Sequence, residues 1–161
     1  MAKQSLIDRW VEELSSDSKS QEESREKLIE TLKEDLRDEL ILAAELEIEA
    51  NHLIYEHLAK EARRLSREKQ QLAKTIEKLI MDLGGTVDNQ DRPTHVAEPD
   101  GHFRDILKLE NELGERFVEQ LIIAEDGGLH EAASVLIKFR EVHYQHQEGI
   151  EGLIMKINTT L

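Results

Sequence analysis

The sequence of 161 residues contains no cysteine, only two prolines and only 4% aromatic residues. The lack of cysteine excludes a disulfide framework, a thiolate zinc site, a cysteine-ligated iron–sulfur cluster and a cysteine nucleophile. Proline and glycine are the residues that most often interrupt helices, and both are scarce here. These absences favour an all-α protein built from long helices.

Basic residues are also in deficit, because 21 Lys and Arg stand against 35 Asp and Glu, for a net charge of −14. Binding to a phosphate backbone requires clustered Lys and Arg, so we expect no nucleic-acid partner. No apolar run approaches the roughly 20 residues that span a bilayer, and the N-terminus lacks the apolar segment of a secretory signal. We therefore expect a soluble, cytoplasmic protein with no membrane partner.

The N-terminal segment is amphipathic. Leu6, Trp10 and Leu14 recur every four residues, which predicts a short helix with one apolar face. The polar stretch 15–24 has no apolar anchor, and we expect it to form a linker or a frayed turn. The sequence thus divides into residues 1–24, an N-terminal amphipathic helix with its linker, and residues 25–161, the main domain.

The region 22–83 carries a helical apolar stripe and contains neither glycine nor proline. A helix of about 60 residues would be about 90 Å long, so we expect the chain to fold back into a hairpin. Ser66 is the preferred turn position because an acidic residue follows it, as at a helix N-terminus, and Asn51 is the second candidate. One unbroken helix shared between two protomers is the alternative.

The second half of the sequence predicts another pair of helices. Gly84-Gly85 ends the first region, and residues 86–101 hold both prolines without a periodic apolar face. A helical pattern follows from Phe103 to a Gly127-Gly128 stop, and the last helix covers about 129–157. The expected fold is a four-helix bundle of two antiparallel hairpins, joined by a long crossover.

Short motifs in the first and third bundle helices resemble a known family. Residues 46–50 (LEIEA) with 55–59 (YEHLA), and Leu109-Glu110 with Phe117, resemble the rubrerythrin and bacterioferritin branch of the ferritin-like superfamily. The resemblance covers about residues 30–157 and implies a ferritin-like four-helix bundle.

The resemblance also implies a metal site. In that family each hairpin supplies an inward Glu and a Glu-x-x-His, and the bundle encloses two iron or manganese ions. Glu47 and Glu110 match the two inward Glu positions, and His143 and His146 are three residues apart, on one face of the last helix. The implied site is therefore a variant one, formed by Glu47, Glu110, His143 and His146, with iron or manganese as the metal.

This sequence departs from the family pattern in both hairpins. His143 stands where a Glu is usual; in another register it takes the His position, with Arg140 in place of the Glu. The second helix contains no histidine. Either Glu68 with Gln71, or Glu77, would have to replace the missing ligands of that helix.

Two functions follow from these observations. The first is metal binding in the bundle core, with ferroxidase- or peroxidase-like chemistry as the resemblance implies. The second is a metal-free ferritin-like scaffold that acts through protein–protein contacts or oligomerisation, which the missing histidine favours. In both cases we expect a homo-oligomer, a dimer or larger, in which Trp10 docks the N-terminal helix onto the bundle or onto a second protomer. The sequence leaves open whether the protein is an enzyme.

Overall fold

The computed structural model describes residues 6–93 and 103–160. Within these ranges the chain is all-α and contains no strand. Its elements are α1 (Leu6–His52), α2 (Glu56–Asp82), the short 3-10 helix η1 (Asn89–Asp91), α3 (Phe103–Asp126) and α4 (His130–Thr160). The expected bundle of about four long helices is confirmed.

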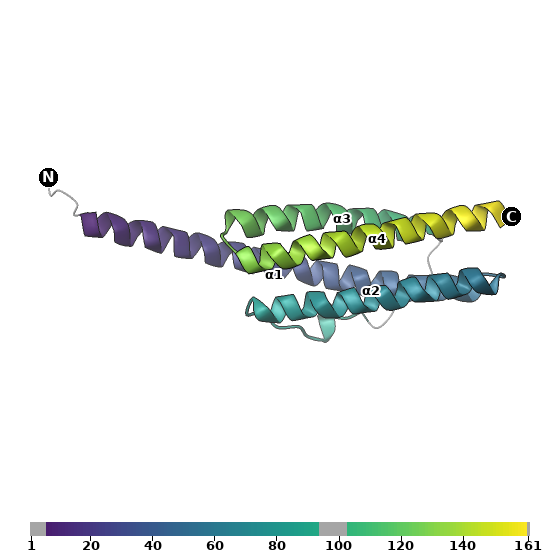
Figure 1. Cartoon of the computed structure of the whole chain (residues 1–161). Coiled ribbons are helices and arrows are strands. Elements are labelled where there is room, and N and C mark those ends of the chain that lie inside the picture. The colour runs from purple at the N-terminus through teal and green to yellow at the C-terminus, as the bar shows by residue number, and fades with distance from the viewer. Residues whose placement is uncertain (1–5, 94–102, 161) are drawn as a thin grey trace.

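The helices form two hairpins that pack side by side (Figure 1). α1 packs against α2 and α3, and α4 packs against the same two helices from the other side of the bundle. α2 and α3 are therefore diagonal to each other. α2 ends at one end of the bundle and α3 begins at the other, so their connection has to span the bundle length (Figure 1). Residues 94–102, which belong to the expected crossover 86–101, lie outside the described residues.

The first hairpin turns at residues 53–55, directly after Asn51 and His52. The prediction that the chain turns at Ser66 is wrong, and so is the alternative of one unbroken helix. Ser66 is buried within α2, where its hydroxyl donates a hydrogen bond of 2.6 Å to the carbonyl of Ala43 in α1. The small polar residue thus joins two helices instead of starting one.

α1 extends well beyond the bundle (Figure 1). The expected N-terminal helix is present, but residues 15–24 continue it as helix and do not form a linker. Polar residues without glycine or proline do not end a helix by themselves. The side chains of Leu6 and Trp10 are exposed, whereas that of Leu14 lies outside the described side chains. None of the described helices combines the length and hydrophobicity that crossing a membrane requires.

Both glycine pairs end helices as expected. Gly84 follows α2 with a φ of +90°, and Gly128 follows α3 with a φ of +70°. The amide of Gly85 donates to Ile80 and that of Leu129 donates to Ala124, which closes the last turn of each helix. The first stop marks the start of the connection between α2 and α3, and the second marks the turn between α3 and α4.

The core consists of Leu, Ile, Phe and Ala side chains from all four helices. Polar and ionisable residues interrupt the apolar stripes near the middle of the bundle. On α3 the buried positions are Phe103, Ile106, Glu110, Leu113, Phe117, Gln120 and Ala124. A helical residue that follows this spacing must face inward whatever its chemistry, and the buried polar groups therefore mark the candidate site.

Candidate functional site

Five ionisable side chains from all four helices meet inside the core. We term them the central cluster: Glu39 of α1, Lys69 of α2, Glu110 of α3, and His143 and His146 of α4. None of the five is more than 3% exposed. Ionisable groups at such depth must be either paired or neutral, because burying an isolated charge costs far more than a hydrogen bond returns.

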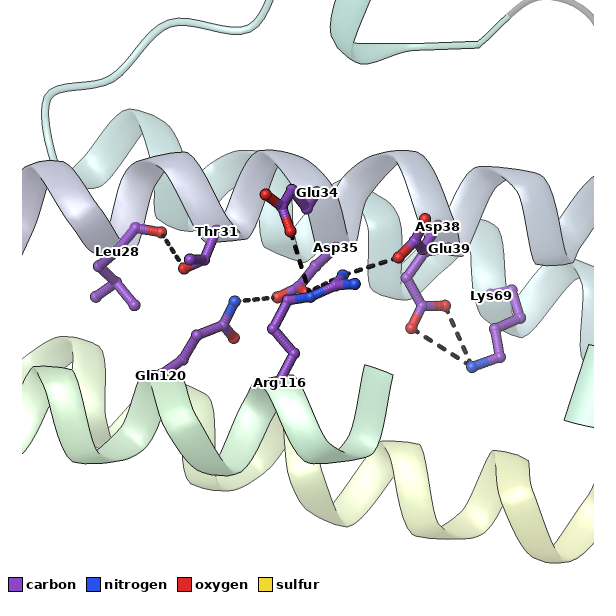
Figure 2. Close-up of polar contacts among 9 residues, drawn as sticks. All are labelled: Leu28, Thr31, Glu34, Asp35, Asp38, Glu39, Lys69, Arg116 and Gln120. Carbon is purple, nitrogen blue, oxygen red and sulfur yellow. Dashed lines mark hydrogen bonds and ion pairs between the residues drawn. The ribbon is translucent and has the colours of Figure 1, made fainter. Parts of the chain in front are cut away.

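Lys69 lies at the centre of this cluster. Its Nζ is 2.6 Å from Oε1 of Glu110 and 2.6 Å from Oε2 of the same carboxylate. It is also 3.4 Å and 3.2 Å from the two carboxylate oxygens of Glu39 (Figure 2). The ammonium group thus connects α2 to α1 and reaches across the bundle to the diagonal helix α3.

His143, on α4 of the same hairpin, contacts the Glu110 carboxylate as well. Its Nδ1 is 2.9 Å from Oε1 of Glu110, and its ring meets Phe117 edge-on with the centroids 5.8 Å apart. Gly114 leaves the room for this ring, since a Cβ there would lie 2.4 Å from Nε2 of His143. The ring of His143 is therefore held by its neighbours on α3.

His146 is one turn further along α4. Its Nε2 is 3.7 Å from Oε2 of Glu68, which is too long for a hydrogen bond. Burial, together with the positive charge of Lys69, lowers the pKa of His146 to about 4. The imidazole is therefore neutral at pH 7.

The two carboxylates of the central cluster differ in their environment. Burial raises the pKa of Glu39 to about 8, and the attraction of Lys69 offsets only part of this effect. Burial acts in the same direction on Glu110, but its contacts with His143 and Lys69 outweigh it and lower the pKa below the ordinary value. At neutral pH Glu110 is therefore the ionised carboxylate that faces the Lys69 ammonium, while Glu39 is largely protonated.

A second group of polar residues lies next to the central cluster, between α1 and α3 (Figure 2). Arg116 of α3 places Nη1 3.0 Å from Asp35 and 2.8 Å from Asp38, while Gln120 donates a hydrogen bond of 2.6 Å to Asp35. Asp35 is one turn before Glu39 on α1. These contacts fix the register of α3 on α1 and thereby the height of Glu110 relative to Lys69.

The structure brings three of the four predicted ligands together. Glu110, His143 and His146 belong to the central cluster, as their positions on the apolar stripes predict. Glu47 does not, because its side chain is 51% exposed and its Oε1 is 3.7 Å from Nε of Arg63. The inward carboxylate of α1 is instead Glu39.

The predicted replacement ligands on α2 lie at different places, and none of them is in the central cluster. The Glu68 carboxylate stays at the edge of the cluster, near His146, and Gln71 is exposed. Glu77 pairs with Arg92, away from the cluster.

Sequence reasoning missed Glu39 and Lys69, although a signal was present. Lys69 falls between Leu65 and Leu72 at steps of four and three on the stripe of α2. Glu39 follows Leu36 by three residues on the stripe of α1. A lysine and a carboxylate at inward positions of paired helices indicate a buried ion pair.

The residues of the central cluster do not fit the two-metal site that the resemblance implies. Within residues 6–93 and 103–160, no three His, Asp or Glu side chains are placed to hold one metal ion. The point between Glu39 and Glu110, which a shared ion would take, is held by the Lys69 ammonium. An ammonium has no lone pair to donate and repels a second cation. Redox chemistry on iron or manganese stays a prediction that this geometry does not support.

Comparison with known proteins assigns no family. No protein-family model matches the chain, and no curated protein matches it at a significant level. Function is therefore inferred from the bundle and its buried charges.

We predict that Gly114→Ala destabilises the protein by about 1–3 kcal/mol, because the new methyl group must displace the His143 ring. The higher helix propensity of alanine, about 1 kcal/mol, opposes this loss. The measurement is urea unfolding followed by circular dichroism. The matched control is Gly152→Ala on α4, where a Cβ meets nothing within 4 Å. Equal stability of the two variants would contradict the proposed role of Gly114.

We predict that His146 makes stability depend on pH between about 6.5 and 4. In this range the unfolded chain protonates the imidazole and the folded chain does not, so stability is present above pH 6.5 and is lost as the pH falls. The loss attributable to this group is at most about 3 kcal/mol. Urea unfolding over a pH series should give a flatter profile for His146→Gln than for the wild type. His130→Gln, at an exposed position of α4, should keep the wild-type profile. Identical profiles for all three proteins would refute the assignment.

Proposed function

We propose that this chain is a ferritin-like helical scaffold that folds without metal and acts by pairing with a second copy of itself. The observation that carries the proposal is the Lys69 ammonium, 2.6 Å from Glu110 and 3.2 Å from Glu39 in a fully buried position. The core contains its own cation at the point that a metal ion would occupy. Folding then requires no ion from outside.

The connectivity supports the ferritin-like assignment. Two antiparallel hairpins joined by one long connection distinguish such bundles from simple up-and-down bundles. In the present chain α2 ends at Asp82 and α3 begins at Phe103. The inward positions Glu110 and His143 also fall where the resemblance implies polar core residues. In a scaffold the same fold needs no metal. The buried polar groups then contribute to the stability of the bundle and to the specific alignment of its helices.

The N-terminal part of α1 supports action through protein contacts. Leu6, Ile7, Trp10 and Val11 form one apolar face and are 59–75% exposed. This part of α1 projects past the bundle, so its own core cannot cover it (Figure 1). An exposed patch of large apolar side chains marks an interaction site. A second copy is the partner we propose, because two such helices can bury the same face against each other and twofold dimers are the commonest assemblies.

The metal-independence part is tested by metal analysis after aerobic loading with iron or manganese and desalting. We expect a sub-stoichiometric content and the same thermal unfolding midpoint with and without a chelator, because Lys69 occupies the position between the carboxylates. The reference protein is the Glu110→Ala/His143→Ala double variant, which should retain equally little metal. Stoichiometric metal in the wild type that disappears in this variant would overturn the proposal.

The self-association part is tested by light scattering coupled to size-exclusion chromatography. We expect a wild-type dimer that becomes a monomer in the Ile7→Ala/Trp10→Ala variant, with unchanged helix content because these residues lie outside the bundle. Met155→Ala, which removes another exposed apolar side chain, should remain dimeric. A monomeric wild type, or a dimer that survives the double substitution, would refute pairing through this face.

A further inference from the structure

We infer that two copies of this chain pair through their N-terminal arms in antiparallel orientation, so that the two bundles lie at opposite ends of the dimer. The arm is residues 6–23 of α1. The bundle begins at Ser24, where a Cβ on Gly127 of the α3–α4 turn would lie 2.5 Å from the Ser24 Cβ. This inference rests on the proposed function, pairing with a second copy, and adds the orientation of that copy.

The apolar face of the arm continues the core-facing stripe of α1. The arm and the bundle part of α1 form one continuous helix, and five turns of an α-helix take about 18 residues. Trp10 and Leu28 are 18 residues apart, and Leu46 follows after the same interval, so the three lie on one face. Leu6 is ten turns before Leu42 in the same way. Because Leu28, Leu42 and Leu46 are buried in the core, the exposed apolar face of the arm points to the same side of α1 as the core.

This orientation determines where a partner helix can lie. Within the bundle, the core-facing side of α1 packs against α2 and α3. These two helices end at Asp82 and Asp126, and the arm projects past both ends (Figure 1). The part of the chain that the structure describes leaves the apolar side chains of the arm exposed. A helix that covers them therefore lies beyond the end of the bundle, in line with its core.

A parallel partner does not fit this position. If the second arm ran in the same direction as the first, its chain would continue past residue 24 into the space that α2 and α3 of the first copy occupy. A helix with its side chains is about 10–12 Å wide, so a small shift cannot relieve this overlap. An antiparallel partner runs away from the first bundle, and its own bundle then lies at the opposite end of the paired arms.

Antiparallel pairing also matches the apolar side chains of the two arms. When the twofold axis passes through the middle of the apolar patch, Ile7 of each copy is level with Trp10 of the other, and Leu6 is level with Val11. These four side chains are 59–75% exposed in the single chain. Each then contacts an apolar side chain of the second copy, and the same patch is used on both copies, as twofold symmetry requires.

Distances between spin labels measure this orientation. The chain has no cysteine of its own, so one introduced cysteine carries the label in each protein. The two positions are Arg9→Cys, close to the twofold axis, and Glu22→Cys, near the base of the arm, and both are exposed. At 1.5 Å per residue, antiparallel pairing places the two Glu22→Cys labels about 40 Å apart. The two Arg9→Cys labels stay within about 25 Å, the width of two adjacent helices, whereas parallel pairing gives this short distance at both positions.

The measurement is double electron–electron resonance on the full-length chain. We expect the short distance for Arg9→Cys and about 40 Å for Glu22→Cys. A short distance at both positions overturns the inference and leaves the proposed function standing. A long distance or no dipolar interaction for Arg9→Cys overturns both, because the arms then do not pair through this patch.

The matched control is the Ile7→Ala/Trp10→Ala background, which removes apolar side chains from the arm and leaves the labelled positions unchanged. Both distances should disappear there as the dimer dissociates. Persistence of either distance in this background overturns the inference together with the proposed pairing, since the contact would then lie elsewhere.

Discussion

The buried contact between Lys69 and Glu110 is the constraint on which the arrangement of this bundle depends. The two residues belong to α2 and α3, which are diagonal in the bundle: among the described residues each of these helices packs against α1 and α4. Lysine is long enough to cross the centre, and its ammonium group also reaches Glu39 on α1. A buried ion pair is weak evidence for stability by itself, since desolvation cancels much of the attraction. Its clearer effect is on specificity, because any shift of one helix by a turn would leave a charge unpaired in the core.

The residues around this contact form a polar layer near the middle of the bundle. Gly114 makes room for the His143 ring, and this ring approaches the carboxylate that Lys69 holds. One turn away, Arg116 fixes α3 on α1 through Asp35 and Asp38. Together these contacts join α2 to α1 and α3, α3 to α4, and α3 to α1. The layer thus aligns all four helices, while the apolar residues above and below it supply most of the burial.

Periodicity in the sequence predicts the helices, the two glycine stops and the inward positions of Glu110, His143 and His146, because each depends on local spacing. It fails where tertiary contacts decide. Ser66 has the chemistry of a helix cap, yet it is buried because α1 offers a carbonyl acceptor at that point. Glu47 lies beside the buried stripe of α1, and short motif similarity cannot distinguish such neighbouring positions. Lys69 is hardest to foresee, since an inward lysine is acceptable only with carboxylates from other helices, and their register is a property of the assembled bundle.

The most direct test of this account is a double-mutant cycle between Lys69 and Glu110. Lys69→Met, Glu110→Gln and the combination of both would be unfolded with urea at neutral pH, and their free energies of unfolding compared with that of the wild type. If the ion pair organises the core, each single variant should lose much of its free energy of unfolding. The loss in the double variant should then be smaller than the sum of the two single losses by about 2–3 kcal/mol. Losses that add within about 0.5 kcal/mol would contradict the central role of the pair.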